Sequence, residues 1–206
     1  MKKLFFSAFF ISMVLLNACK ENERKLPYLG THSIVKNDTQ YYKIPDFRFQ
    51  DQNERAFGSD ELKSKPYIAY FFFTSCPSIC PRMSLSAKRI QLALKDYKND
   101  YNMVSFTVDP ERDNFNKLRE YAEEYNADTI NWHFIRGSED EITELGIKGF
   151  FVGISKDKLA PGGFLHTEKM ILVDGSGHPR GYYSGTDNYE IKKLIGDMQM
   201  LIRQKL

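Results

Sequence analysis

The chain contains the run Tyr67-Ile68-Ala69-Tyr70-Phe71-Phe72-Phe73-Thr74, followed directly by Ser75-Cys76-Pro77-Ser78-Ile79-Cys80-Pro81. An almost wholly apolar run of this length is typical of a β-strand that is covered on both faces. Proline is tolerated in the first turn of a helix but not in its interior, so Pro81 predicts a helix start with Cys80 beside the cap. The stretch therefore predicts a buried strand leading into a helix, with two cysteines at the helix N-terminus.

Residues on both sides of this stretch predict further strands and helices. An early strand is expected over 41–50, where Pro45 favours an edge position. After the cysteines, hydrophobic periodicity and turn residues predict a helix over 83–97, a strand over 103–109, a helix over 118–125, a strand over 132–135, a short helix opened by Ser138 and Glu141, strands over 169–174 and 181–184, and a last helix from Asp187. This order predicts an α/β fold of thioredoxin-like, peroxiredoxin-related type, with a central mixed sheet flanked by helices and an N-terminal hairpin.

The N-terminus has the pattern of a bacterial lipoprotein signal. Lys2 and Lys3 precede an apolar segment over 4–16, which is shorter than the roughly 20 residues needed to cross a bilayer, and Leu16-Asn17-Ala18-Cys19 follows. We expect residues 1–18 to be a removed signal peptide, Cys19 to carry lipid, 19–40 to form a flexible tether and 41–206 to form the domain. The expected location is the cell envelope, anchored to a bacterial membrane with the domain outside the cytoplasm. An ordinary secretory signal beside an unmodified cysteine is the alternative.

Composition narrows the classes of partner. The chain has 29 basic and 27 acidic residues, a formal charge of +2, and no stretch that concentrates Lys or Arg among aromatic residues. Nucleic acid is therefore not expected as a partner. Sixteen Phe and twelve Tyr predict a packed core rather than a disordered chain, and we expect a monomer.

The two cysteines of the motif are candidates for metal or redox chemistry. A helix N-terminus favours thiolate, the form that binds metal or attacks a disulfide. Thioredoxin-type oxidoreductases have two residues between their cysteines, whereas Cys76 and Cys80 are separated by three, which lets both sulfurs face one ion and still permits a disulfide. The threonine or serine that precedes the attacking cysteine of peroxiredoxins by three residues is absent. Two merely buried cysteines are the third possibility.

Two thiolates suit Cu(I), and an added imidazole makes the site tolerable to Cu(II). Among the four histidines, His32 lies in the expected tether, His133 in an expected strand and His178 in an expected turn. His166 follows a glycine-rich segment over 148–164 and opens the strand whose start approaches the cysteine loop in thioredoxin-like proteins. A segment this long without periodicity is more often functional than idle. From position alone, an ordinary loop histidine remains the simpler interpretation.

Three motifs resemble the Sco (SCO1/SenC) family of cytochrome oxidase assembly proteins. They are Phe73-Thr74-Ser75-Cys76-Pro77-Ser78-Ile79-Cys80-Pro81, Val108-Asp109-Pro110-Glu111-Arg112-Asp113, and Phe164-Leu165-His166-Thr167 followed by Ile171-Leu172-Val173-Asp174-Gly175-Ser176-Gly177. The resemblance covers roughly residues 41–204 in the same order. It implies that Cys76, Cys80 and His166 bind one copper ion.

The chain departs from the family pattern at positions that are not ligands. Leu165 stands where the family often has Asp, Asn53-Glu54 where it commonly has Asn-Gly, and Asn114-Phe115 where it usually has Thr-Pro. Leu165 removes a carboxylate that would orient the imidazole. Asp109 has two interpretations: it ends a strand and shapes the next turn, or it tunes the copper site or contacts a partner.

The resemblance leaves two functions open. The first is a copper metallochaperone that delivers one ion to the binuclear copper site of a cytochrome c oxidase. The second is a thiol-disulfide oxidoreductase, with Cys76 and Cys80 as a redox pair, that reduces the acceptor's cysteines or acts in envelope redox homeostasis. Candidate partners are the copper-site subunit of the oxidase, other copper chaperones and thiol reductants. Zinc is a weaker alternative, because the histidines lack the close spacing of a closed Cys2His2 site.

Overall fold

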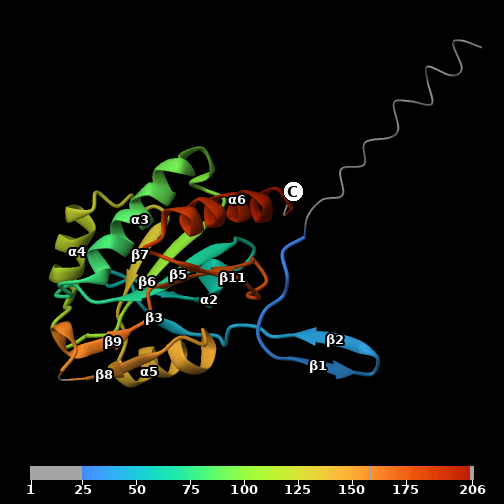
Figure 1. Cartoon of the computed structure of the whole chain (residues 1–206), viewed down its shortest axis with the longest axis horizontal. Coiled ribbons are helices and arrows are strands. Elements are labelled where there is room, and N and C mark those ends of the chain that lie inside the picture. Colours follow the sequence, from blue (N-terminus) through green and yellow to red (C-terminus); the bar gives the residue numbers. More distant parts are fainter. Residues whose placement is uncertain (1–24, 158, 205–206) are drawn as a thin grey trace, which may run out of the picture.

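The computed structural model describes residues 25–157 and 159–204. In this part of the chain the central sheet has five strands, in the order β11-β10-β5-β6-β7 (Figure 1). Strands β5, β6 and β7 are parallel, whereas β10 runs antiparallel to β5 and β11. The predicted mixed sheet is therefore confirmed. Its strands are Tyr67–Phe72 (β5), Asn102–Thr107 (β6), Trp132–Ile135 (β7), Lys169–Val173 (β10) and Pro179–Ser184 (β11).

Helices flank the sheet on both sides. In Figure 1, α3, α4 and α6 lie above the sheet and α5 lies below it. The Asp187 carboxylate accepts hydrogen bonds from the backbone of Tyr189 and Glu190, which confirms the predicted start of the last helix. The helices are Ser59–Leu62 (α2), Ile79–Ala93 (α3), Phe115–Glu124 (α4), Glu139–Glu144 (α5) with a π-helical turn over Leu145–Gly149, and Asn188–Gln204 (α6), besides 3-10 turns over Lys95–Tyr97 and Pro161–Gly163.

Strand β5 lies at the centre of the core, and all six of its residues are buried. Side chains alternate along a strand, so its consecutive phenylalanines reach opposite faces of the sheet. On one face Phe71 stacks on Phe106, with ring centroids 5.2 Å apart. On the other face Phe72 packs against Tyr121 of α4, at 5.0 Å. The prediction of a strand covered on both faces is confirmed.

The register of the sheet brings three connections to one edge. Phe72 pairs with Thr107, so β5 and β6 end side by side, and the loops that follow them begin together. Val108 extends this pairing by donating its backbone N–H to the Phe72 carbonyl at 2.9 Å. Strand β10 is antiparallel to β5, so its first residue, Lys169, starts at the same edge. The cysteine loop, the loop after β6 and the link before β10 therefore converge.

Three two-stranded hairpins surround the central sheet in the described residues. The predicted N-terminal hairpin is formed by Arg48–Gln50 (β3) and Ala56–Gly58 (β4). The segment over 148–164, expected to be a loop, contains Ile154–Lys156 (β8), which pairs with Phe164–His166 (β9). The remaining hairpin is formed by His32–Val35 (β1) and Asp38–Tyr41 (β2).

The structure differs from the expectation of a flexible tether up to residue 40. Residues 32–41 form the β1–β2 hairpin, which stands away from the body of the protein in Figure 1 and is exposed along both strands. Before it, Leu26 is buried, and Arg180 binds its carbonyl oxygen. The expected signal peptide and Cys19 lie outside the described residues. Among the helices that the structure describes, none is long and apolar enough to cross a membrane.

His133 occupies β7, as the sequence predicts, and is a buried titratable group. Its imidazole packs on the ring of Phe57, with centroids 4.2 Å apart. Its Nδ1 atom is buried and has no hydrogen-bond partner among the described residues. Burial lowers the pKa of His133 to about 4, although the charges of Asp51 and Glu61 favour the protonated form.

We expect the fold to lose stability as the pH falls from 6.5 to 4, because the unfolded chain protonates this histidine in that window and the folded chain does not. The free energy of unfolding should fall by about 2–3 kcal/mol through this group. Urea denaturation of the wild type and of His133→Phe at pH 7 and pH 4.5 isolates the effect, since carboxylate titration is common to both proteins. An equal loss of stability in the two proteins would contradict the prediction.

Candidate functional site

The cysteine loop connects β5 to α3. The backbone N–H of Cys76 donates to the Phe73 carbonyl at 3.3 Å, which closes a turn directly after the strand. Helix α3 begins at Ile79 with Ser78 as its N-cap, so Cys80 is the second helical residue. The helix starts two residues before the predicted position. Pro81 is still accommodated, because the backbone N–H groups of the first turn have no partner within a helix.

Both cysteines are buried, and the Cys80 thiol is hydrogen-bonded to the Cys76 sulfur. Cys76 and Cys80 are 6% and 1% exposed, and the Cys76 sulfur lies 3.6 Å from the Ser78 hydroxyl. Hydrogen bonding to the Cys76 sulfur and burial raise the pKa of the Cys80 thiol, while a backbone hydrogen bond from Phe73 opposes the shift. This direction is opposite to the thiolate expected at a helix N-terminus. The pair retains a proton that a soft cation between the sulfurs would replace.

Asp113 is hydrogen-bonded to the start of the cysteine loop. It is fully buried, and its carboxylate accepts the Thr74 backbone N–H at 3.0 Å and the hydroxyls of Thr74 and Thr107 at 2.5 Å each. Burial raises the pKa of Asp113, and the hydrogen bonds from Thr107 and Thr74 oppose the rise. Thr74 is two residues from Cys76, so this carboxylate connects the loop after β6 to the base of the cysteine loop.

The backbone of His166 lies at the end of β9, paired with Ile154 of β8. The tip of this hairpin packs beside the cysteine loop. A Cβ atom at Gly162 would lie 2.5 Å from the Phe73 ring and 3.5 Å from Pro77. The ring of Phe164 lies 5.6 Å from that of Phe73. The hairpin and the cysteines are therefore neighbours, whereas the orientation of the His166 side chain is outside what the structure describes.

The other histidines have separate surroundings. His32 lies in β1, His133 is packed on Phe57, and the Nδ1 atom of His178 lies 2.7 Å from the Tyr42 carbonyl oxygen. In the part of the chain with described side chains, no three His, Cys, Asp or Glu residues form a cluster that could hold a metal ion. Among side chains of these four types, His166, whose side chain lies outside the description, is therefore the remaining candidate for a third ligand to the thiol pair.

Asp109 follows β6 at the edge where the loops converge. It is 3% exposed, and its backbone N–H donates to the Thr107 hydroxyl at 3.1 Å. Its carboxylate accepts a hydrogen bond from Arg112. Both interpretations of Asp109 survive, because this contact shapes the turn and also reaches the residue that touches the His166 hairpin. Sequence analysis did not single out Arg112, although it lies in one of the quoted motifs.

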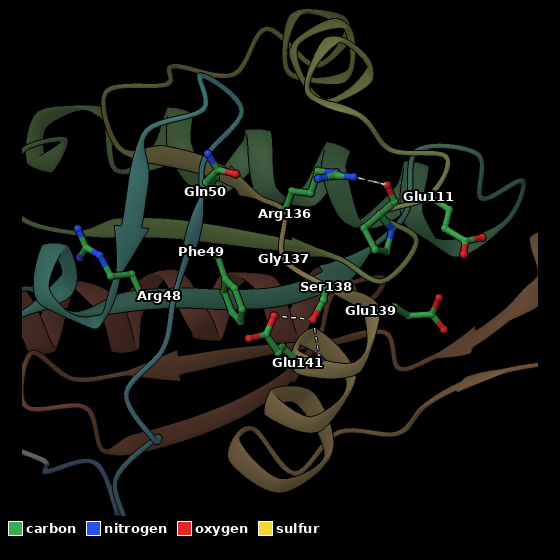
Figure 2. A pocket seen from close by; sticks show the side chains of 10 residues that line it. Arg48, Phe49, Gln50, Glu111, Arg136, Gly137, Ser138, Glu139 and Glu141 are labelled. Carbon is green, nitrogen blue, oxygen red and sulfur yellow. Dashed lines mark hydrogen bonds between the residues drawn. The ribbon is translucent and has the colours of Figure 1, made fainter.

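A hollow of about 590 Å³ borders the loop after β6. Residues 48–50 of β3, Pro110, Glu111, residues 136–139 and Glu141 line it, so neither cysteine is among its lining residues. Figure 2 shows Arg136 donating to the Pro110 carbonyl oxygen beside it, at 3.0 Å. The side chains that line the hollow carry both positive and negative charges, and they indicate no particular class of ligand. The hydrogen bond from Arg136 holds the loop that leads to Arg112.

Comparison with known proteins agrees with this architecture. A family model described as SCO1/SenC matches residues 35–203. The crystal structure of a SCO1/SenC family lipoprotein from Bacillus anthracis is 32% identical, with a TM-score of 0.72 over 78% of this chain and 95% of that chain. The predicted thioredoxin-like fold is thereby confirmed.

Two further structures are informative. BsSco, described as a member of the Sco family of cytochrome c oxidase assembly proteins in which a disulfide switch was identified, is 31% identical, with a TM-score of 0.70 over 78% of this chain and 94% of that chain. Arabidopsis thaliana ScoI with copper bound is 25% identical, with a TM-score of 0.65 over 79% of this chain and 99% of that chain. Because the family model spans most of the sequence, the chain belongs to the SCO1/SenC family.

Proposed function

We propose that this protein is a copper metallochaperone that binds one copper ion through Cys76, Cys80 and His166 and delivers it to the copper site of a cytochrome c oxidase. The observation that carries the proposal is the pair of buried, mutually hydrogen-bonded thiols beside the hairpin that bears His166. Soft sulfur ligands select copper over the harder divalent ions. The copper-bound Arabidopsis relative and the assembly role of BsSco support it.

Transfer of a metal ion needs ligands that can be exchanged one at a time. The two sulfurs lie on the rigid junction between β5 and α3, while the proposed imidazole lies on a hairpin that is separate from the central sheet. A rigid dithiol retains the ion after the histidine leaves, so an acceptor can approach from the side of the hairpin. Copper is the cargo in this scheme.

The thiol pair also supports a second function, that of a thiol-disulfide oxidoreductase. The two sulfurs are within hydrogen-bond contact, so both can be oxidised to one disulfide while the disulfide of a partner is reduced to two thiols. The disulfide switch described for BsSco favours keeping this candidate.

Replacing His166 distinguishes the two functions. His166→Ala is expected to weaken copper binding and to leave disulfide exchange with a peptide disulfide intact, because exchange needs only the sulfurs. His178→Ala is the matched control, since His178 contacts Tyr42 away from the cysteine loop. Copper affinity can be measured by competition with a chelator, and exchange by the release of peptide thiol. Unchanged copper affinity in His166→Ala, with exchange abolished in Cys76→Ser, would favour the oxidoreductase.

We further propose that lipid on Cys19 anchors the protein to a bacterial membrane, with the domain outside the cytoplasm. The motif ending at Cys19 and the lipoprotein among the relatives support this. Anchoring confines the domain near a membrane-embedded acceptor and raises its effective concentration.

Cys19→Ser is expected to abolish lipid attachment, so the protein should move to the soluble fraction or remain unprocessed. Fractionation followed by mass spectrometry of the N-terminus measures this. The purified domain should bind copper like the wild type. A correctly processed, membrane-bound Cys19→Ser protein would contradict the proposed anchor.

A further inference from the structure

The hairpin that bears His166 is connected to the central sheet by the chain but is not paired with it. On one side, Thr167 and Glu168 connect it to β10, which is paired into the central sheet. In the described residues, however, β8 and β9 pair with each other and not with a strand of that sheet. The position of the hairpin over the cysteine loop therefore depends on side-chain contacts, which include the buried Ile154 and the Lys156–Glu139 ion pair of β8 as well as the contacts at its tip.

Arg112 makes these contacts from the loop after β6. Its Nη2 atom donates to the Gly162 carbonyl oxygen at 2.6 Å, and its Nε atom donates to the Asp109 carboxylate. Its guanidinium carbon also lies 5.8 Å from the ring centroid of Phe73 and 6.0 Å from that of Phe164. One side chain thus touches the loop after β6, the residue that directly follows β5, and the hairpin.

The loop that carries Arg112 is held in place by hydrogen bonds on both sides of this residue. Asp113 is buried and accepts three hydrogen bonds from Thr74 and Thr107. The Pro110 carbonyl accepts two from Arg136, at 3.0 and 3.3 Å. Because these bonds fix the turn on both sides of Arg112, its backbone is held in a defined position relative to the central sheet.

The backbone at the hairpin tip lies close to Phe73 and Arg112. Gly162 has φ +82, a conformation that side chains rarely adopt, and a Cβ atom there would lie 2.5 Å from the Phe73 ring. The absence of a side chain lets the backbone approach Phe73 closely and presents its carbonyl oxygen to Arg112. Phe164 then packs on Phe73 from β9, two residues before His166.

We propose that Arg112 is a positioning residue for the third copper ligand: through its two-armed bridge from Asp109 to the Gly162 carbonyl it holds the His166 hairpin over the cysteine pair. Asp109 serves as the anchor of this bridge. The inference rests on the proposed function for its consequence in copper binding, whereas the bridge itself belongs to the metal-free protein. Arg112 touches neither the cysteines nor His166 in the contacts described and acts through the hairpin.

The first test uses the metal-free protein. Arg112→Ala removes the hydrogen bond that the charged guanidinium donates to the hairpin. Hydrogen exchange of the hairpin amides should therefore become faster by at least about tenfold. One of these amides is that of Asp157, which donates to the Gly163 carbonyl. The β5 amides should exchange as in the wild type, which shows that the variant is folded. Arg119→Ala is the matched control: Arg119 is also partly exposed and bonds to a backbone carbonyl, that of Gln52, away from the hairpin.

The second test measures Cu(I) affinity by anaerobic competition with a chelator. Arg112→Ala is expected to weaken binding by about 10- to 100-fold, the usual effect of losing a residue that orients a ligand. In the His166→Ala background the same substitution should have no further effect, because the ligand it positions is gone. Arg112→Lys should resemble Arg112→Ala, since one ammonium group on a shorter reach cannot form both arms of the bridge.

The outcomes separate the two proposals. A wild-type protein that binds no copper refutes the proposed function, and the hydrogen-exchange result then decides on the bridge. If the wild type binds copper, wild-type affinity in Arg112→Ala or equal losses in the two backgrounds would overturn the positioning role. Unchanged hairpin exchange in Arg112→Ala, or wild-type behaviour of Arg112→Lys in both tests, would overturn the bridge.

Discussion

Replacing Arg180 by alanine is expected to lower the free energy of unfolding by about 3–5 kcal/mol. Arg180 lies in β11 and is 8% exposed, and its guanidinium donates to the Asp174 carboxylate at 2.7 Å. The same group donates to the Leu26 carbonyl at 2.5 Å and the Pro27 carbonyl at 2.9 Å. Its loss would leave a buried carboxylate without its counter-ion and two carbonyl groups without a donor.

Chemical denaturation measures this loss, and two variants control it. Lys117→Ala removes a solvent-exposed pair with Glu120 and should leave the stability close to that of the wild type. Combining Arg180→Met with Asp174→Asn should cost less than Arg180→Met alone, because the unpaired buried charge is then absent. If Arg180→Ala loses no more stability than Lys117→Ala, this account of the Arg180 cluster is wrong.

The consequence reaches beyond stability, since Arg180 fixes the place where the chain enters the domain. It holds residues 26 and 27, and its guanidinium carbon lies 4.1 Å from the Tyr28 ring centroid. If Cys19 is lipidated as proposed, the segment between anchor and domain ends here rather than near residue 40. The domain would then lie closer to the membrane than a tether that extends to residue 40 allows.

Much of the fold was predictable because local pattern and burial agree. Strand β5 is apolar throughout since both of its faces are buried, and α6 begins where Asp187 supplies the cap. The start of α3 was misplaced by two residues because Pro81 is compatible with several positions in a first turn. The β1–β2 hairpin was missed because its strands are exposed and lack an apolar face. The signal in the sequence is Asn37, since asparagine is common in two-residue hairpin turns. In the structure Lys36 and Asn37 both have the positive φ values that such a turn requires.

The site was less predictable than the fold. The spacing of Cys76 and Cys80 predicts that both sulfurs face one point, and the structure places them in contact. For Cys80 the thiolate prediction has the wrong direction, because helix position is visible in a sequence, whereas burial and the hydrogen bond to Cys76, which raise the pKa of this thiol, are not. The bridge from Arg112 to Gly162 joins residues fifty positions apart through a backbone carbonyl, which no side-chain pattern marks. The assignment of His166 depends on family resemblance and stays a prediction.

Loss of one cysteine is expected to have the largest effect on metal binding. Cys80→Ser should lower copper affinity by several orders of magnitude, because a hydroxyl replaces one of two soft sulfur ligands. Cys80 is 1% exposed, and serine is close to it in size, so the fold should be retained. Ser84→Ala, in the same helix and equally buried, is a matched control that leaves both sulfurs in place.

The most direct measurement is an anaerobic titration of the reduced protein with Cu(I), followed by competition with a chelator of known affinity. The account predicts saturation at one copper per monomer, tight binding in Ser84→Ala and loss of tight binding in both Cys76→Ser and Cys80→Ser. Failure of the reduced wild type to bind copper, or unchanged affinity in either cysteine variant, would contradict a copper site at this pair of thiols.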